Sequence, residues 1–298
     1  MSVHLIAVDC VNLRALFLNV SPSMSCEILV QPDLLDLGGI QLEVRHLPGS
    51  KPGQPTFVLL HEGLGCAAQW RDFPEQLLAA TGCGVLVYSR QGYGRSSPVS
   101  LPRPLDYLSH DGPVELACLL DVLGLNDVVL LGHSDGASIV LAYAALNDPR
   151  VWGSIALAPH VLVEARTLAG IRQTTAQWDA GPLRSQLMRH HGDNVEGAFH
   201  GWSDSWLHAD FSLEPLVARL GEIIRPLLVI QGRDDQYATP EQLTVIDAHV
   251  NTPCRCVLLD DCQHFPQREA TQATLRLIVD FVAALTDDRD PRAAPVIS

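Results

Sequence analysis

The chain has 298 residues, of which 47% are hydrophobic and 18% are charged. This composition excludes a disordered chain, and the length fits one α/β domain that carries an insertion. The formal net charge of −14 argues against nucleic-acid binding as the main task, because phosphate recognition requires clustered lysine and arginine.

The first twenty residues, MSVHLIAVDCVNLRALFLNV, are mildly apolar but lack a basic start and a convincing cleavage pattern for a signal peptide. Asp9 and Arg14 interrupt the apolar run, and no run elsewhere approaches the roughly 20 residues of a membrane-spanning helix. We therefore expect a cytoplasmic protein with neither a membrane nor a nucleic acid as partner. Residues 1–25 are expected to form a poorly ordered leader, and the oligomeric state stays open.

Apolar runs rich in β-branched residues alternate with helical patterns along the chain, which is typical of a mostly parallel sheet with helices on both faces. Residues 26–30 and 40–46 come first and predict an antiparallel pair that turns at Gly38-Gly39. The strands predicted for the parallel part are residues 56–60, 84–88, 128–131, 154–158, 227–230 and 255–259. The helices predicted between them are residues 67–80, 112–123, 137–146, 241–250 and 270–285. The predicted fold class is therefore α/β, with a doubly wound central sheet.

The alternation breaks over residues 161–224, where helical patterns occur without a strand. Because open α/β sheets bind ligands at the carboxyl ends of their strands, we expect this insertion to form a helical lid there. The core would then comprise residues 26–160 and 225–286, and residues 287–298 would form a loose tail. Three of the five tryptophans lie in the insertion, namely Trp178, Trp202 and Trp206.

The sequence Gly132-His133-Ser134-Asp135-Gly136 lies between a predicted strand and a predicted helix. Glycines on both sides of the serine allow a sharp backbone bend, and the helix N-terminus adds the positive end of a dipole. This is the context of the nucleophile-elbow motif G-x-S-x-G. A serine nucleophile needs a base and an orienting acid, and acidic residues and a histidine follow at the ends of two later strands.

With these motifs the chain resembles the α/β-hydrolase family from about residue 26 to residue 285. Four loops carry the resemblance besides the elbow: LLHEGLG (59–65), YSRQGYGRS (88–96), GRDD (232–235) and CQHFPQRE (262–269). They are similar, in that order, to the family's oxyanion loop, the loop after its fourth strand, its acid turn and its histidine loop.

The resemblance implies Ser134 as nucleophile, His264 as general base and Asp235 as the acid that orients the histidine. The backbone N–H groups of Gly63 and Asp135 would then form the oxyanion hole. Glu62 departs from the family's usual H-G start of the oxyanion loop. Its carboxylate would oppose catalysis unless it points away or pairs with a cation such as Arg90 or Arg95.

A substrate pocket is expected under the lid, and the residues expected to line it are His160, Trp178, Trp202 and Trp206. For each tryptophan the alternative is packing within the lid, because a small helical cap needs a core of its own. The expected substrate is a small molecule with an apolar portion.

The function implied first is hydrolysis of a carboxylic ester, lactone or thioester through an acyl-enzyme, with no cofactor and no catalytic metal. The second is hydrolysis of a carbon–carbon bond in a vinylogous diketone, which would require a lid arginine and an asparagine for the substrate carboxylate. The lid arginines available for this are Arg172, Arg184 and Arg189. A ligand-binding protein on an inactive hydrolase fold is the third interpretation, and the complete triad counts against it.

The eight cysteines include no C-x-x-C pair. Cys254 and Cys256 are spaced to leave one face of a strand, so a zinc site with Cys262 and His264 is possible. We favour reduced cysteines that pack as small hydrophobic residues, and we expect no metal.

Overall fold

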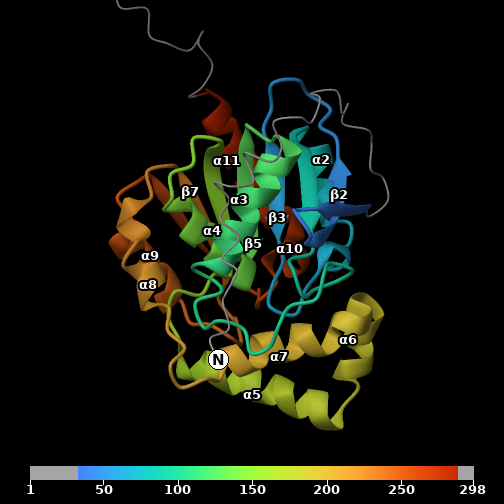
Figure 1. The fold of residues 1–298 in the computed structure, drawn as a ribbon. Helices are drawn as coiled ribbons and strands as arrows, with labels where there is room; N and C mark the ends of the chain where they lie inside the picture. The colour runs from blue at the N-terminus through green and yellow to red at the C-terminus, as the bar shows by residue number, and fades with distance from the viewer. Residues whose placement is uncertain (1–32, 288–298) are drawn as a thin grey trace, which may run out of the picture.

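The structure, a computed structural model, describes residues 33–287 and has the predicted α/β fold (Figure 1). Its central sheet has eight strands in the order β1-β2-β4-β3-β5-β6-β7-β8. The strands from β3 onward pair in parallel, whereas β2 pairs antiparallel with both β1 and β4. The strands are β1 (Asp33–Asp36), β2 (Gln41–Leu47), β3 (Thr56–Leu60), β4 (Gly84–Tyr88), β5 (Val128–His133), β6 (Val151–Leu157), β7 (Leu227–Gly232) and β8 (Cys254–Leu259).

The antiparallel pair at the start of the sheet differs in part from the prediction. The expected turn is present, with φ of 79° at Gly38 and 103° at Gly39, but the strand before it is Asp33–Asp36. The strand predicted at residues 26–30 lies outside the described residues, as do the predicted leader and the tail after residue 287.

Helices cover both faces of the sheet, because successive side chains of a buried strand point to opposite faces. Phe57 and Leu59 of β3 pack in the layer of α2 (Phe73–Thr81) and α11 (Thr271–Asp287). Val58 and Leu60 pack in the layer of α3 (Asp111–Leu123) and α4 (Asp135–Ala144). Near β7, the second face is completed by α8 (Glu214–Val217), the 3-10 helix η3 (Leu220–Glu222) and α9 (Glu241–His249).

The prediction of a single helix over residues 67–80 is wrong. The structure has a 3-10 helix, η1 (Ala67–Trp70), followed by α2. The two are separated at Arg71, whose φ of 55° is outside the helical range, and Pro74 then occupies the first turn of α2.

Three helices form a cap at one end of the molecule, at the carboxyl ends of the parallel strands (Figure 1). They are α5 (Ala165–Ala180), α6 (Leu183–His191) and α7 (Val195–Trp206). The later part of the insertion packs elsewhere, since Leu216 and Leu220 lie in the apolar cluster of Leu141 on α4. We call residues 165–206 the cap. Over residues 33–287, no helix combines the length and apolarity needed to cross a bilayer.

Candidate active site

Ser134 stands in a strained turn between β5 and α4. Its φ of 53° is in the left-handed region, which non-glycine residues rarely adopt. The turn requires glycine on both sides, because a Cβ at Gly132 would lie 2.2 Å from the carbonyl oxygen of Gly136. A Cβ at Gly136 would lie 2.1 Å from the carbonyl oxygen of Leu60. The local sequence thus produces the sharp elbow that G-x-S-x-G predicts.

The structure brings Ser134, His264 and Asp235 together. The Ser134 hydroxyl donates to Nε2 of His264 over 3.0 Å, and Nδ1–H of His264 donates to Oδ2 of Asp235 over 2.8 Å. All three side chains are buried. This is the geometry in which an imidazole removes the serine proton while a carboxylate fixes the imidazole tautomer.

The carboxylate of Asp235 is held by the backbone around it. Its Oδ1 accepts the N–H groups of Tyr237 and Ala238 at 2.8 and 3.2 Å. Burial opposes its charge, but the interaction with His264 and these N–H donors outweigh burial and lower the pKa of Asp235. The neighbouring Asp234 is exposed, so Asp235 alone of the two acids faces the histidine.

A cavity of about 570 Å³ opens onto Ser134 and His264 beneath the cap. Of the residues expected at the site, Gly63, Asp135, His160, Trp202 and Trp206 line it.

Trp178 does not line the cavity, so its prediction as a pocket residue is wrong. Its ring stacks on Phe199, with centroids 3.9 Å apart and planes 8° from parallel. This buried pair joins α5 to α7 and forms the core of the cap, which is the packing role that the sequence left as the alternative.

Asp135 follows the serine and is fully buried. The hydroxyl of Tyr107 donates to its Oδ2 over 2.5 Å, and Nε1 of Trp206 donates to its Oδ1 over 3.2 Å. Burial nevertheless dominates and raises the pKa of Asp135, with Arg90 and the two hydrogen bonds opposing the shift. Sequence reasoning did not identify Tyr107, which lies in a loop with no motif around it.

The loop after β3 is fixed from two sides. His61 accepts the N–H of Arg90 at Nε2 over 3.0 Å, and its Nδ1 lies 2.7 Å from the carbonyl oxygen of Glu62. Burial lowers the pKa of His61 well below its usual value, which keeps the ring neutral for these contacts. On the other side, the indole of Trp202 covers Gly63 so closely that a Cβ there would lie 2.2 Å from Cδ1 of the indole.

Glu62 lines the cavity, and its carboxylate faces the imidazole of His133 and the guanidinium of Arg268. Oε2 lies 3.4 Å from Nδ1 of His133, and Oε1 lies 4.0 Å from Nη2 of Arg268. Burial opposes the charge, but His133 and Arg268 outweigh it and lower the pKa of Glu62 to about 2. The cation that this carboxylate faces is therefore Arg268, whereas Arg90 donates to the main-chain carbonyl oxygen of Glu62 over 3.0 Å.

His160 lies beside the triad, with its ring centroid 5.6 Å from that of His264. Burial, with repulsion from His264, lowers the pKa of His160 to about 3, so the ring is neutral at physiological pH. Its Nδ1 is buried and has no hydrogen-bond partner among the described residues.

Cationic side chains were largely missed by sequence reasoning. Three arginines line the cavity, Arg71, Arg189 and Arg268, against two carboxylates, Glu62 and Asp135. Only Arg189 was among the lid arginines considered, and Arg184 pairs with Glu196 away from the cavity lining. Arg268 lies four residues after His264 in the sequence, and this proximity is the signal that could have indicated it.

The zinc quartet considered from the sequence is not assembled. His264 is hydrogen-bonded to Ser134 and Asp235, and the buried Cys262 contacts Glu269. Cys254 and Cys256 lie together with Asp247 instead.

The sheet order, the cap and a serine at the elbow after β5 define an α/β hydrolase. A family model described as "Alpha/beta hydrolase family" matches residues 57–277. The chain therefore belongs to the α/β-hydrolase family.

Two bacterial hydrolases are similar in sequence to most of this chain. A 2-hydroxy-6-oxononadienedioate/2-hydroxy-6-oxononatrienedioate hydrolase of Cupriavidus pinatubonensis is 29% identical over 80% of this chain and 90% of its own length. A hydrolase named for the same substrates, from Pseudomonas putida, is 27% identical over 77% of this chain and 88% of its own length.

Solved structures share the fold at lower sequence identity. The proline iminopeptidase of Mycobacterium smegmatis has a TM-score of 0.67 at 17% identity, covering 87% of this chain and 100% of its own. The enol-lactonase of Burkholderia xenovorans has a TM-score of 0.65 at 21% identity, covering 84% and 100%. These identities support the fold and not a substrate.

Proposed function

We propose that this protein hydrolyses a bond to a carbonyl carbon, with Ser134 as nucleophile, in a small substrate that carries a carboxylate. The observation that supports this proposal most directly is the position of His264, hydrogen-bonded to Ser134 on one side and to Asp235 on the other. A bifunctional imidazole of this kind removes the serine proton and later returns it to the leaving group.

The reaction begins when Nε2 of His264 takes the hydroxyl proton as Oγ of Ser134 attacks the carbonyl carbon. The N–H groups of Gly63 and Asp135 would stabilise the oxyanion, since both residues line the cavity beside the serine. Collapse of the tetrahedral intermediate breaks the bond to the leaving group, which takes the proton from His264. A water molecule then hydrolyses the acyl-enzyme by the same steps.

The first candidate reaction is hydrolysis of a carbon–carbon bond next to a ketone, as in a vinylogous diketone acid. Support comes from the relatives named as hydrolases of 2-hydroxy-6-oxononadienedioate, which are similar over about four-fifths of the chain. Arg189 of the cap also lines the cavity, where a lid arginine of the kind expected for this reaction could bind the substrate carboxylate. A guanidinium recognises a carboxylate with two parallel hydrogen bonds.

The second candidate is hydrolysis of an ester or lactone, and one observation favours it. No asparagine lines the cavity within residues 33–287, so the second requirement for a diketone acid is not met by the described lining. An alkoxide leaving group needs only the proton carried by His264, whereas a carbon leaving group must also be stabilised as an enolate.

A substrate panel separates the two candidates: a ring-cleavage diketone acid, aryl esters of graded acyl length, and lactones. We expect a fluorophosphonate to label Ser134 stoichiometrically, and Ser134→Ala to abolish both labelling and turnover, as loss of a triad serine costs about a millionfold in kcat. A folded protein that resists the label would instead be a ligand-binding member of the family.

The carboxylate requirement is tested with a matched pair of arginines on α6. Arg189→Met should lower kcat/KM for a carboxylate substrate about 10- to 100-fold, the cost of a charged hydrogen bond, and leave a neutral ester of similar size unaffected. Arg184→Met removes an arginine paired with Glu196 outside the cavity lining and should change neither value. Equal behaviour of the two variants on both substrates would refute an anionic substrate.

A further inference from the structure

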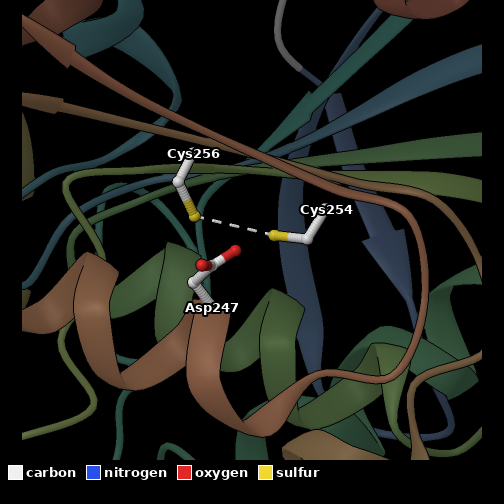
Figure 2. A group of neighbouring side chains, drawn as sticks. All are labelled: Asp247, Cys254 and Cys256. Atoms are coloured by element: carbon white, nitrogen blue, oxygen red, sulfur yellow. Dashed lines mark hydrogen bonds between the residues drawn. The ribbon is translucent and has the colours of Figure 1, made fainter.

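Two thiols and a carboxylate meet between the last strand of the sheet and the helix that covers it. Figure 2 shows Cys254 and Cys256 of β8 directed toward Asp247 of α9. The two sulfur atoms are 3.7 Å apart, and one donor atom from each of the three residues lies within 4.8 Å of the others. This cluster is separate from the hydrolytic site, since none of its members lines the cavity.

At 3.7 Å one thiol can donate to the other, and the same separation suits two thiolates bound to one tetrahedral ion. Two thiolates bound at about 2.3 Å to one tetrahedral zinc ion lie about 3.8 Å apart. A carboxylate oxygen at about 2.0 Å in the same tetrahedron would lie about 3.5 Å from each sulfur. The sulfurs therefore need almost no movement. The carboxylate of the exposed Asp247, whose oxygen lies within 4.8 Å of both sulfurs, would move about 1 Å closer to them.

The backbone explains why the two thiols are already paired. Cys254 and Cys256 are two residues apart on a strand, so both side chains leave the same face. Arg255 between them points to the opposite face, where it lies 4.0 Å from Asp280 of α11. Sγ of Cys256 faces the start of α9, with the carbonyl oxygen of Leu243 at 4.0 Å.

The site is reachable from solvent, because both cysteines are only partly buried and Asp247 is exposed. β8 is the last strand of the sheet, and no strand of the described residues pairs with its outer edge. The floor of the site is apolar, formed by Leu243 and other members of the cluster around α9. A partly enclosed apolar floor strengthens the attraction between anionic ligands and a cation.

We propose that Cys254, Cys256 and Asp247 bind one thiophilic divalent cation of the zinc class, with water as the fourth ligand. Thiolate sulfur selects such borderline-soft ions over magnesium or calcium. The bound ion would tie β8 to α9 and so stabilise this edge of the sheet. It takes no part in the proposed hydrolysis.

The test uses the full chain under a reductant that does not bind metal, with Cd²⁺ as probe, because thiolate–Cd²⁺ charge transfer gives an ultraviolet absorption band. Cys10 and Cys26 lie outside the described residues and are changed to Ser in every sample, so that they cannot supply sulfur ligands. We expect one Cd²⁺ per chain, displaced by an excess of Zn²⁺, and a melting temperature that rises with metal concentration.

Variants assign the ligands. Because loss of a residue that only supports a metal ligand already costs about 10- to 100-fold in affinity, Cys254→Ser and Cys256→Ser should each weaken binding by about 100-fold or more. Asp247→Ala should weaken binding by at least about tenfold. The matched control is Cys118→Ser, which removes a half-buried thiol of α3 and should leave both band and affinity unchanged.

Two outcomes would overturn the proposal. One is Cd²⁺ binding that is no tighter in the parent protein than in the Cys254→Ser variant. The other is an absorption band that survives in Cys256→Ser but disappears in Cys118→Ser. Unchanged affinity in Asp247→Ala would remove the carboxylate from the ligand set and refute the three-ligand site.

Discussion

Nε1 of Trp206 donates to Oδ1 of Asp135 over 3.2 Å, and this bond connects the last turn of α7 to the residue after Ser134. The carboxylate accepts a second bond from Tyr107 and is fully buried. A buried carboxylate oxygen without a hydrogen-bond partner would be costly, so moving Trp206 away from Asp135 would be costly too. The bond therefore stabilises the position of α7 over the elbow.

Trp206→Phe keeps an aromatic ring in place but removes the N–H donor. We expect the free energy of unfolding to fall by about 1.5–3 kcal/mol, the cost of a hydrogen bond to a charged group, and kcat/KM to fall with it. The measurement is urea unfolding beside turnover at neutral pH. Trp178→Phe is the control, since its ring stacks on Phe199 and all bonds to Asp135 remain. Equal losses in the two variants would show that the bond to Asp135 contributes nothing beyond ring packing.

The two adjacent acids after β7 should differ sharply in their effect on catalysis. Asp235→Asn removes the carboxylate that fixes the His264 tautomer, and in a comparable triad this change costs about 10⁴ in kcat. Asp234 is exposed and contributes its backbone N–H to Cys262, a bond that Asp234→Asn retains. The check is kcat for both variants after their melting temperatures have been shown to agree. A severe loss in Asp234→Asn with a mild one in Asp235→Asn would reverse the assignment.

Features that depend on neighbouring residues were predictable from the sequence. The elbow follows from glycines at fixed positions around Ser134, and the strand pattern follows from apolar runs, so both needed only local information. The order of serine, acid and histidine along the chain then indicated which loops would meet.

Features that depend on distant contacts were not predictable. Glu62 and Arg268 are 206 positions apart, and only the packed sheet brings them together. Trp178 and Trp202 lie in similar helical patterns, yet one stacks inside the cap and the other covers Gly63, because their helices face different neighbours. The break at Arg71 depends on a single backbone angle that helix periodicity does not encode.

Glu62 should make the stability of the protein depend on pH in the acid range. Its pKa falls from 4.5 to about 2 on folding, so its carboxylate stabilises the fold above pH 4.5 and loses that contribution as pH falls toward 2. Glu62→Gln should therefore lower the free energy of unfolding at pH 7, on the order of 2 kcal/mol, and less at pH 3. Urea unfolding of both proteins at pH 7, 4.5 and 3 measures the difference. A difference that stays constant across these values would contradict a charge-dependent role.

The last prediction concerns Gly136, in the first turn of α4. Alanine there would place its Cβ 2.1 Å from the carbonyl oxygen of Leu60 and 2.6 Å from that of His61. These are backbone atoms of β3 and of the loop after it, so the contact is relieved only by moving α4 away from the sheet. That movement would displace Ser134 from His264, where the two now share a hydrogen bond of 3.0 Å.

We expect Gly136→Ala to be destabilising by more than about 3 kcal/mol, as overpacking at a rigid site is, and to react far more slowly with a fluorophosphonate. Gly197→Ala is the matched control, since this glycine also lies in the first turn of a helix, α7, and a Cβ there would meet only Val99, at 3.8 Å. It should leave labelling unchanged and stabilise the protein by up to about 1 kcal/mol through helix propensity. The measurements are urea unfolding and the rate of labelling. A Gly136→Ala protein as stable and as reactive as Gly197→Ala would show that the elbow does not depend on close contact between α4 and β3.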